Sequence, residues 1–362
     1  MPINPAIPDH SAVASEIGRY PGQPSHGASA SNIDRSLDRS LLARPLPRII
    51  FMGTPEFAVA SLDAILTAGY NVVAVITAPD KPAGRGMQMT VSAVKKYALE
   101  KGLKILQPEK LKNPDFLEEL RSLAADLQIV VAFRMLPEVV WNMPPMGTVN
   151  LHGSLLPQYR GAAPINWAVI NGETETGVTT FKLQQDIDTG NILMQDRFPI
   201  GPSETAGEVH DRMKEIGARL LVRTIAGLVA GTLTATPQEN PTGLRHAPKI
   251  FTETCRIDWT SPTDEIYNLI RGLSPFPAAF TTLDGKLLKI YRSEKEKPAV
   301  PPTAPPGTPV AHLAPGATDT DQKTYLRFAT ADGFIRVTEL QLEGKKKMSV
   351  EDFLRGYKPS RQ

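Results

Sequence analysis

The stretch Arg48-Ile-Ile-Phe-Met-Gly-Thr-Pro-Glu-Phe57 passes from a strand-like apolar run, through a turn, into a segment with helical periodicity. The same alternation continues to about Leu233. The strand-like runs cover residues 48–52, 71–77, 104–106, 127–133 and 148–151, and the helix-like segments cover residues 56–68, 91–101 and 115–123. Short strands that alternate with helices predict βαβ units around a mostly parallel sheet, so we expect an α/β fold.

Ligands of such sheets bind outside the carboxyl ends of the strands, so a site is expected among the residues that follow each strand. The turn after the first strand, Gly53 to Phe57, contains one glycine. A dinucleotide-binding turn needs three glycines, for the tight turn, for the approach of the pyrophosphate and for helix packing. The sequence therefore argues against a bound NAD.

Length and composition indicate a globular protein of more than one domain. The chain has 362 residues, 41% of them hydrophobic, which corresponds to two or more domains of roughly 150 residues. Its longest strongly apolar stretch, Leu220 to Leu233, is interrupted by Arg223 and falls short of the roughly 18 residues that a membrane span requires. We therefore expect no membrane association. The net charge of +2 does not by itself indicate binding to nucleic acid.

The single cysteine, Cys255, excludes an internal disulfide and any metal site built from several cysteines. Because disulfides are rare in reducing compartments, this composition predicts a cytoplasmic protein.

The chain divides into four segments by composition. Residues 1–45 carry seven Ser and six Pro without apolar periodicity, and we expect them to form a disordered N-terminal extension. Residues 46–233 form the α/β domain, and the polar, Pro-containing residues 234–250 form a linker. Residues 251–362 contain short strand-like runs with turn signals, which predicts a small β-barrel. Within it, the Pro-rich stretch 298–315 is expected to be an exposed loop.

A first cluster of polar side chains lies at the end of the fifth predicted strand. Asn150 and His152 are two residues apart in an extended segment, so both side chains project from one face. An amide N–H and an imidazole directed at one carbonyl oxygen suit acyl transfer, because that oxygen becomes an oxyanion. A histidine without a catalytic role is the alternative. The other five histidines are scattered, and no pair has the spacing of a zinc site.

A second cluster, Gln185-Asp-Ile-Asp-Thr-Gly-Asn191, lies between two strand-like runs. A carboxylate of Asp188 could orient an imidazole or relay a proton from an attacking amine. The alternative is a plain turn, for which Asp-Thr-Gly is well suited. Asp-Thr-Gly also occurs in aspartic proteases, but these need two carboxylates that share a proton, and this chain has one copy.

Two basic segments could contact nucleic acid. In the loop Pro79-Asp-Lys-Pro-Ala-Gly-Arg-Gly86, which includes Lys81, glycines on both sides of Arg85 let its guanidinium reach a phosphate. Near the C-terminus, Lys345, Lys346 and Lys347 could contact a phosphate backbone. Solvated surface residues are the alternative for both segments.

Five motifs resemble, in order and spacing, those of the folate-dependent methionyl-tRNA formyltransferase family. They are Arg48-Ile-Ile-Phe-Met-Gly-Thr-Pro-Glu-Phe57, Asn150-Leu-His-Gly-Ser-Leu-Leu-Pro157, Arg160-Gly-Ala-Ala-Pro-Ile165, Asn171-Gly-Glu-Thr-Glu-Thr-Gly-Val178 and Asp188-Thr-Gly190. The resemblance extends from about Pro47 to Tyr357. It implies a Rossmann-like, mostly parallel N-terminal formyltransferase domain and a smaller, OB-like C-terminal β-barrel that binds tRNA.

The resemblance also implies an activity and a role for three residues. A formyl group would pass from 10-formyltetrahydrofolate to the α-amino group of methionyl initiator tRNA, without a metal. Asn150 would hydrogen-bond the formyl oxygen, and His152 would stabilise the developing oxyanion. Asp188 would polarise the imidazole and assist proton movement to the leaving nitrogen.

The binding residues that the resemblance implies fall into two groups. The folate would contact Phe133, Leu136, Pro137, Ser154, Leu155, Leu156 and Pro157. The tRNA would contact Lys81, Arg85, Lys345, Lys346 and Lys347. The partners are thus the initiator methionyl-tRNA and the folate, and we expect a monomer.

Three departures from the usual family pattern are visible. The folate-loop segment Val131-Ala-Phe-Arg-Met-Leu-Pro137 is shorter and carries Arg134. The residues after the Arg85 loop, Met87-Gln-Met-Thr90, are uncharged where lysines are common. Asp186 and Ile187 precede the Asp188 turn in place of a hydrophobic residue and glycine.

Two other functions are open. A UDP-amino-sugar N-formyltransferase shares the Asn-x-His and Arg-Gly-x-x-Pro blocks, but Gly84-Arg-Gly86 and Leu273-Ser-Pro-Phe-Pro277 resemble the tRNA enzymes. A catalytically inactive RNA-binding relative would keep the scaffold, but the presence of Asn150, His152 and Asp188 argues against it. A glycinamide ribonucleotide enzyme would not need residues 251–357.

Overall fold

The structure is a computed structural model that describes residues 46–83, 88–239, 242–296 and 313–357. The expected N-terminal extension, Arg85 and most of the Pro-rich stretch lie outside these ranges. No helix among the described residues is long and apolar enough to cross a membrane.

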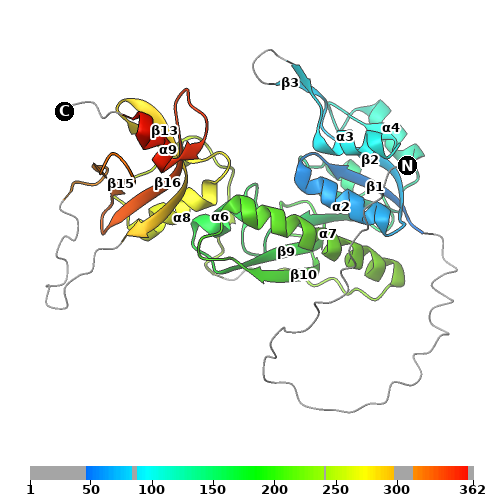
Figure 1. Cartoon of the computed structure of the whole chain (residues 1–362). Coiled ribbons are helices and arrows are strands. Elements are labelled where there is room, and N and C mark those ends of the chain that lie inside the picture. Colours follow the sequence, from blue (N-terminus) through cyan, green and yellow to red (C-terminus); the bar gives the residue numbers. More distant parts are fainter. Residues whose placement is uncertain (1–45, 84–87, 240–241, 297–312, 358–362) are drawn as a thin grey trace, which may run out of the picture. The chain divides into compact units, whose positions relative to one another are not determined.

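A seven-stranded sheet organises the first part of the described chain (Figure 1). Its strands, in order across the sheet, are β10 (Ile192–Pro199), β9 (Glu175–Lys182), β7 (Thr148–His152), β6 (Leu127–Val131), β1 (Arg48–Gly53), β2 (Asn71–Ile76) and β5 (Ile105–Leu106). The five strands from β7 to β5 are parallel, and β9 runs antiparallel to both β7 and β10. The predicted mostly parallel sheet is therefore confirmed.

Helices cover both faces of this sheet, which explains why β1 is apolar at consecutive positions. Ile49 and Phe51 pack into one core with α2 and α7, whereas Ile50 and Met52 pack into a second core with α4 and α5. The helices of this region are α2 (Glu56–Thr67), α3 (Ala93–Glu100), α4 (Pro114–Ser122), α5 (Glu138–Trp141), α6 (Pro164–Ile170) and α7 (Ala206–Ala230). Ile49, Ile50, Phe51 and Met52 are all fully buried.

Two short paired segments lie outside the large sheet. β3 (Lys81–Ala83) and β4 (Gln88–Thr90) form an antiparallel hairpin that carries the predicted Arg85 loop between them. β8 (Arg160–Gly161) pairs in parallel with β11 (His246–Ala247), which lies in the expected linker. Neither pair was expected, because segments of two or three residues are too short to show a period in the sequence.

The C-terminal part is built on an antiparallel sheet, as the strand-like runs predicted. Its path is β12 (Ala279–Leu283), β13 (Lys286–Glu296), β16 (Phe334–Leu342), β15 (Leu326–Ala329) and β14 (Thr318–Thr320), with β17 (Met348–Ser349) on β16. The helices α8 (Thr263–Leu273) and α9 (Val350–Gly356) add Ile266, Ile270 and Phe353 to the core of this sheet. The strands were expected from the sequence, whereas the helix α8 was not.

The long helix α7 begins with a capping box. The hydroxyl of Thr205 accepts a hydrogen bond from the Glu208 backbone N–H at 3.3 Å, and the Glu208 carboxylate accepts one from the Thr205 N–H at 2.8 Å. Two N–H groups that the helix cannot pair itself are thereby satisfied. Because α7 packs on α2 and on the sheet, this cap also fixes the helix that borders the candidate site.

We predict that Thr205→Val lowers the free energy of unfolding by about 1 kcal/mol, the usual cost of a lost N-cap hydroxyl. Valine keeps the buried volume of Thr205, which is 5% exposed, so the effect reports the hydrogen bonds of the hydroxyl, which also donates to the Glu208 carboxylate at 2.9 Å. Urea denaturation of the purified protein measures it. Thr205→Ser keeps the hydroxyl and serves as the control; equal losses in both variants would contradict the capping argument.

Candidate active site

A cavity of about 580 Å³ opens at the carboxyl ends of β6 and β7, where the parallel-sheet rule places a site. The residues after β6, residues 161–166 and residues 183–188 supply most of its wall. Phe57 of α2 and His210 of α7 line it as well, and their rings pack 5.2 Å apart between centroids. The cavity is large enough for a small ligand.

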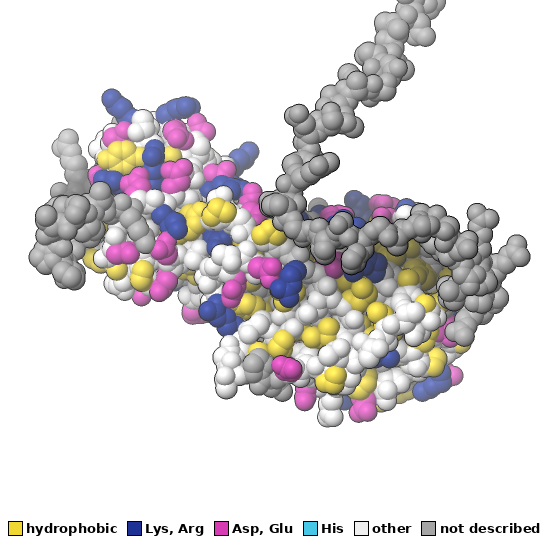
Figure 2. All heavy atoms as spheres, turned by 90° about the horizontal axis from the view of Figure 1, so that it is seen from below, with side chains coloured by type: hydrophobic (Ala, Val, Ile, Leu, Met, Phe, Trp, Pro, Cys, Tyr) yellow, Lys and Arg dark blue, Asp and Glu magenta, His cyan; other side chains and the backbone are white. Residues whose placement is uncertain are grey.

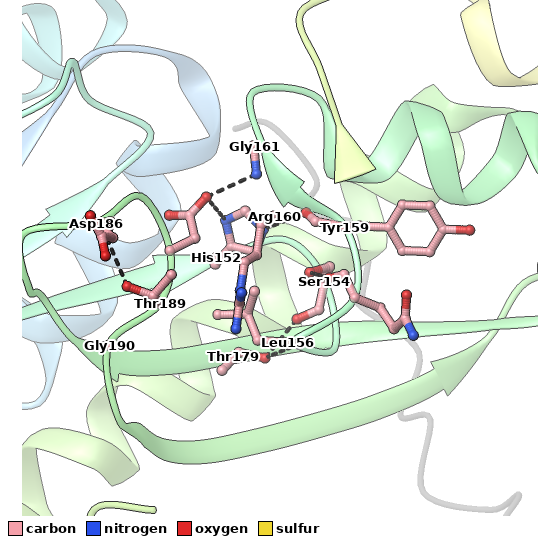
Figure 3. A network of polar contacts seen from close by, with 12 residues as sticks. His152, Ser154, Leu156, Tyr159, Arg160, Gly161, Thr179, Asp186, Thr189 and Gly190 are labelled. Carbon is pink, nitrogen blue, oxygen red and sulfur yellow. Dashed lines mark hydrogen bonds and ion pairs between the residues drawn. The ribbon is translucent and has the colours of Figure 1, made fainter. Parts of the chain in front are cut away.

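His152 ends β7 and is buried, with 7% of its surface exposed. Its Nε2 lies 2.9 Å from the carbonyl oxygen of Tyr159, and its Nδ1 lies 3.7 Å from Oδ2 of Asp188. The backbone N–H of Gly161 donates to the same Asp188 oxygen at 2.9 Å (Figure 3). The structure thus brings together His152 and Asp188, which are 36 residues apart in sequence.

The contact with Tyr159 determines which imidazole nitrogen carries a hydrogen. A carbonyl oxygen only accepts hydrogen bonds, so Nε2 of His152 must be the donor. In the neutral ring, Nδ1 then presents its lone pair toward the Asp188 carboxylate. A proton taken up on Nδ1 would be stabilised by that carboxylate. The arrangement therefore suits an imidazole that gains and returns a proton at Nδ1.

Asn150 lies two residues before His152 on β7, and both side chains line the cavity. Among the described residues no group hydrogen-bonds the Asn150 side chain, although this residue is only partly exposed. Its carboxamide is therefore available to a ligand, with an N–H donor for a carbonyl oxygen.

The turn that carries Asp188 has an unusual backbone. Asp188 has a φ of 55°, in the left-handed region that Asp tolerates better than most residues. At Gly190, a Cβ atom would lie 1.7 Å from the carbonyl oxygen of Lys182, so only glycine fits. The hydroxyl of Thr189 donates to the Asp186 carbonyl at 3.1 Å. Each residue of Asp-Thr-Gly thus has a structural reason in this turn.

The residues expected to bind folate separate into two groups. Phe133 and Leu136 line the cavity, whereas Pro137 and the segment Ser154–Pro157 are not among its lining residues. Ser154 and Leu156 are instead fastened to β9, since the Thr179 hydroxyl donates to the Ser154 carbonyl at 2.6 Å and accepts from the Leu156 N–H at 3.1 Å. Figure 3 shows Ser154, Leu156 and Thr179 beside His152.

The expected tRNA-binding lysines lie on turns and hairpins. Lys81 is exposed on β3, and Arg85 lies outside the described residues. Lys345, Lys346 and Lys347 are exposed between β16 and β17, where Lys347 pairs with Glu339 at 2.7 Å. On the face shown in Figure 2, basic and acidic side chains are interspersed. This face therefore shows no continuous patch of basic side chains among the described residues.

Arg134, a departure from the family pattern that was not expected in the site, lies at the cavity wall. The Arg134 side chain lines the cavity and donates to the backbone carbonyls of Pro108 and Glu109, the latter at 2.8 Å. Burial lowers the pKa of Arg134 from its ordinary value. An arginine inside an otherwise apolar run was the signal for this position. His210 gave no such signal, because its neighbours in sequence form an ordinary helix.

Comparisons with known proteins agree with this architecture. A family model described as "Formyl transferase" matches residues 47–225, and one described as "Formyl transferase, C-terminal domain" matches residues 249–358. The fold and the site thus define a formyl transferase with two domains. Relatives then narrow the class: the chain belongs to the methionyl-tRNA formyltransferase family.

The relatives are similar over nearly their whole length. The methionyl-tRNA formyltransferase of Parabacteroides distasonis is 57% identical over 322 residues, which cover 86% of this chain and 96% of the relative. That of Bacteroides fragilis is 53% identical over 319 residues, covering 86% and 95%.

Solved structures show the same fold at lower identity. The sugar 3N-formyl transferase WlaRD has a TM-score of 0.58 at 21% identity, over 84% of this chain and all of that one. An N-formyltransferase from Helicobacter canadensis has a TM-score of 0.59, with the same identity and coverage.

We predict that Gly190→Ala disrupts the Asp188 turn, because the new Cβ would overlap the Lys182 carbonyl oxygen. The variant should unfold at a clearly lower temperature than the wild type and should lose formyl transfer. Gly231→Ala is the control without a clash, since Gly231 has a positive φ of 69° but open space around it; there we expect a loss of about 1 kcal/mol. Calorimetry compares the two, and equal melting temperatures would refute the steric argument.

Proposed function

We propose that the protein transfers the formyl group of 10-formyltetrahydrofolate to the α-amino group of methionyl initiator tRNA, for translation initiation. The observation that carries this proposal is the convergence of Asn150, His152 and Asp188 on one cavity in a chain of this family. A UDP-amino-sugar acceptor is not favoured, because the sugar enzymes are 21% identical whereas the methionyl-tRNA enzymes reach 57%. An inactive relative would have no need for the three polar side chains.

In the reaction, the neutral amine attacks the formyl carbon, and the carbonyl electron pair moves to the oxygen. The Asn150 N–H donates to this oxyanion, as in other oxyanion holes. Nε2 of His152 is held by the Tyr159 carbonyl. Nδ1 is therefore the imidazole nitrogen that accepts a proton during the reaction. Asp188 stabilises a proton there. The attacking nitrogen gives one proton to Nδ1 of His152, the bond from the formyl carbon to N10 breaks, N10 takes up that proton, and the new amide keeps the formyl group.

We place the substrates by the same reasoning. The folate lies against Phe133 and Leu136 in the cavity, and Ser154–Pro157 support the site from β9. Pro137 adjoins this folate-binding segment. The acceptor tRNA contacts Lys81, Arg85 and the three lysines Lys345–Lys347. We further propose that the protein acts as a monomer in the cytoplasm, with a catalytic domain at 46–233 and a tRNA-binding domain at 251–362.

We predict that His152→Ala and Asp188→Ala each lower kcat by about 10²-fold to 10⁴-fold, the usual contribution of acid–base and oxyanion groups. Their affinity for methionyl-tRNA should be nearly unchanged, because His152 is buried and the Asp188 side chain is only 12% exposed. Acid-gel separation of formylated methionyl-tRNA measures the rate, and filter binding measures affinity.

The wild-type assay includes methionyl initiator tRNA, methionyl elongator tRNA and a UDP-amino sugar. Transfer to the initiator tRNA alone supports the proposal. Transfer to the sugar alone would overturn the assignment of the acceptor while keeping the chemistry, and no transfer to any acceptor would overturn both.

We also predict that Arg134 assists folate binding. Both carbonyl partners of its guanidinium are neutral, so its positive charge at the cavity wall is available to the glutamyl carboxylates of a folate. Arg134→Gln should raise the KM for 10-formyltetrahydrofolate about tenfold, the worth of one charge-assisted hydrogen bond, and leave the KM for tRNA unchanged. Lys101→Gln removes the same charge from the end of α3 as a control. A rise in the KM for tRNA instead would assign Arg134 to the other substrate.

A further inference from the structure

In the segment between α7 and the C-terminal domain, the side chain of Gln238 contacts the turn that carries Asp188. Its Nε2 donates to the backbone carbonyls of Asp188 at 2.9 Å and Gly190 at 2.7 Å. Its Oε1 accepts from Nε of Arg160 at 3.1 Å and from Nη2 of Arg160 at 2.7 Å. Both ends of this carboxamide are therefore engaged, across 48 to 78 residues of sequence.

These four hydrogen bonds connect the two backbone segments that orient the Asp188 carboxylate. One segment is the turn itself, whose carbonyl groups at positions 188 and 190 receive Gln238. The other is β8, where the Arg160 side chain donates to Gln238 and the next residue, Gly161, donates its N–H to Asp188 Oδ2 at 2.9 Å. A shift of either segment would change where the carboxylate points.

Asp188 needs such support for two reasons. Its left-handed φ of 55° is a sparsely populated conformation for a non-glycine residue, which persists only when its surroundings hold it. The 3.7 Å between Asp188 Oδ2 and His152 Nδ1 is also longer than a hydrogen bond, so the pair does not secure its own geometry. The position of the Asp188 carboxylate is therefore set by the backbone of its own turn and by β8.

The connecting segment also makes backbone hydrogen bonds on both sides of Gln238 in sequence. Before it, Thr236 exchanges two backbone hydrogen bonds of 2.8 Å with Ile192 of β10. After it, the carbonyl of Arg245 accepts from the Tyr159 N–H at 2.6 Å, and His246–Ala247 pairs with β8 as β11. A flexible linker would show none of these contacts.

We propose that Gln238 is a positioning residue for formyl transfer, which holds Asp188 in register with His152 through the turn and β8. The connecting segment is thus part of the framework of the active site. This inference rests on the proposed function for its kinetic test, while its structural test is independent of any acceptor.

Two substitutions separate the contacts of Gln238. Gln238→Ala removes all four hydrogen bonds, whereas Gln238→Glu keeps an acceptor for Arg160 and loses the two donated bonds to the Asp188 turn. We expect both variants to lower kcat about tenfold or more, with little change in either KM, because misplacing a reacting group by a fraction of an ångström is costly. Full activity of Gln238→Glu would overturn the proposal.

A double-mutant cycle tests whether Gln238 acts through Asp188. In the Asp188→Ala background, Gln238→Ala should lower kcat by less than about twofold, since the group that it positions is gone. An undiminished effect in that background would show that Gln238 acts elsewhere. The matched control is Gln128→Ala. Gln128 is a buried glutamine near the start of β6, away from the cavity, and it accepts a hydrogen bond at 3.1 Å from Thr148, the first residue of β7.

The structural test uses ¹⁵N NMR of the histidine rings at fixed pH, with the His152 signals assigned by their absence in His152→Asn. Gln238→Ala should shift them in the same direction as Asp188→Ala, and Gln128→Ala should leave them in place. Unshifted His152 signals in Gln238→Ala would overturn the proposal even if the enzyme proves to use another acceptor. Shifted signals without formyl transfer in the wild type would reject the proposed function and leave the positioning role standing.

Discussion

The hydrogen bond from His152 Nε2 to the carbonyl oxygen of Tyr159 is the constraint on which the site depends. It assigns the hydrogen to Nε2, leaves Nδ1 facing Asp188, and fixes the ring at the end of β7. The acceptor carbonyl is itself rigidly held. Tyr159 has a φ of 60°, and its hydroxyl donates to Glu173 at 2.5 Å while accepting from Arg245 at 3.2 Å. Burial, with the Glu173 hydrogen bond, raises the pKa of Tyr159.

The central strands of the sheet were predictable from sequence because they are continuously apolar. β1 and β6 are buried on both faces, and this environment leaves a clear signal in runs such as Ile49–Met52. The convergence of Asn150 and His152 also followed from sequence, since the two-residue repeat of a strand is a property of the backbone alone. These are local regularities, and local regularities can be read without knowing the fold.

The contacts that were not foreseen are of a different kind. Gln238 bonds to Asp188, 50 positions away, and Arg245 bonds to Tyr159, 86 positions away, and no period in the sequence marks these contacts. The Ser154–Pro157 segment shows the same limit, because its attachment to Thr179 depends on how β9 adds to β7. A polar residue in an irregular segment has no pattern, and its partner is defined only once the chain has folded.

Two aspartates in this chain show how surroundings separate a carboxylate that faces an imidazole from one that closes a turn. Asp321 accepts hydrogen bonds from the Thr324 hydroxyl and from three backbone N–H groups, and the Thr324 bonds above all hold the pKa of Asp321 well below its usual range. The negative charge of Asp321 is stabilised by hydrogen bonds within the turn that it closes. Asp188 accepts one hydrogen bond from the described residues, that of Gly161, although its side chain is only 12% exposed. A carboxylate so sparsely satisfied directs its charge at the nearest imidazole, and it is in that direction that His152 lies.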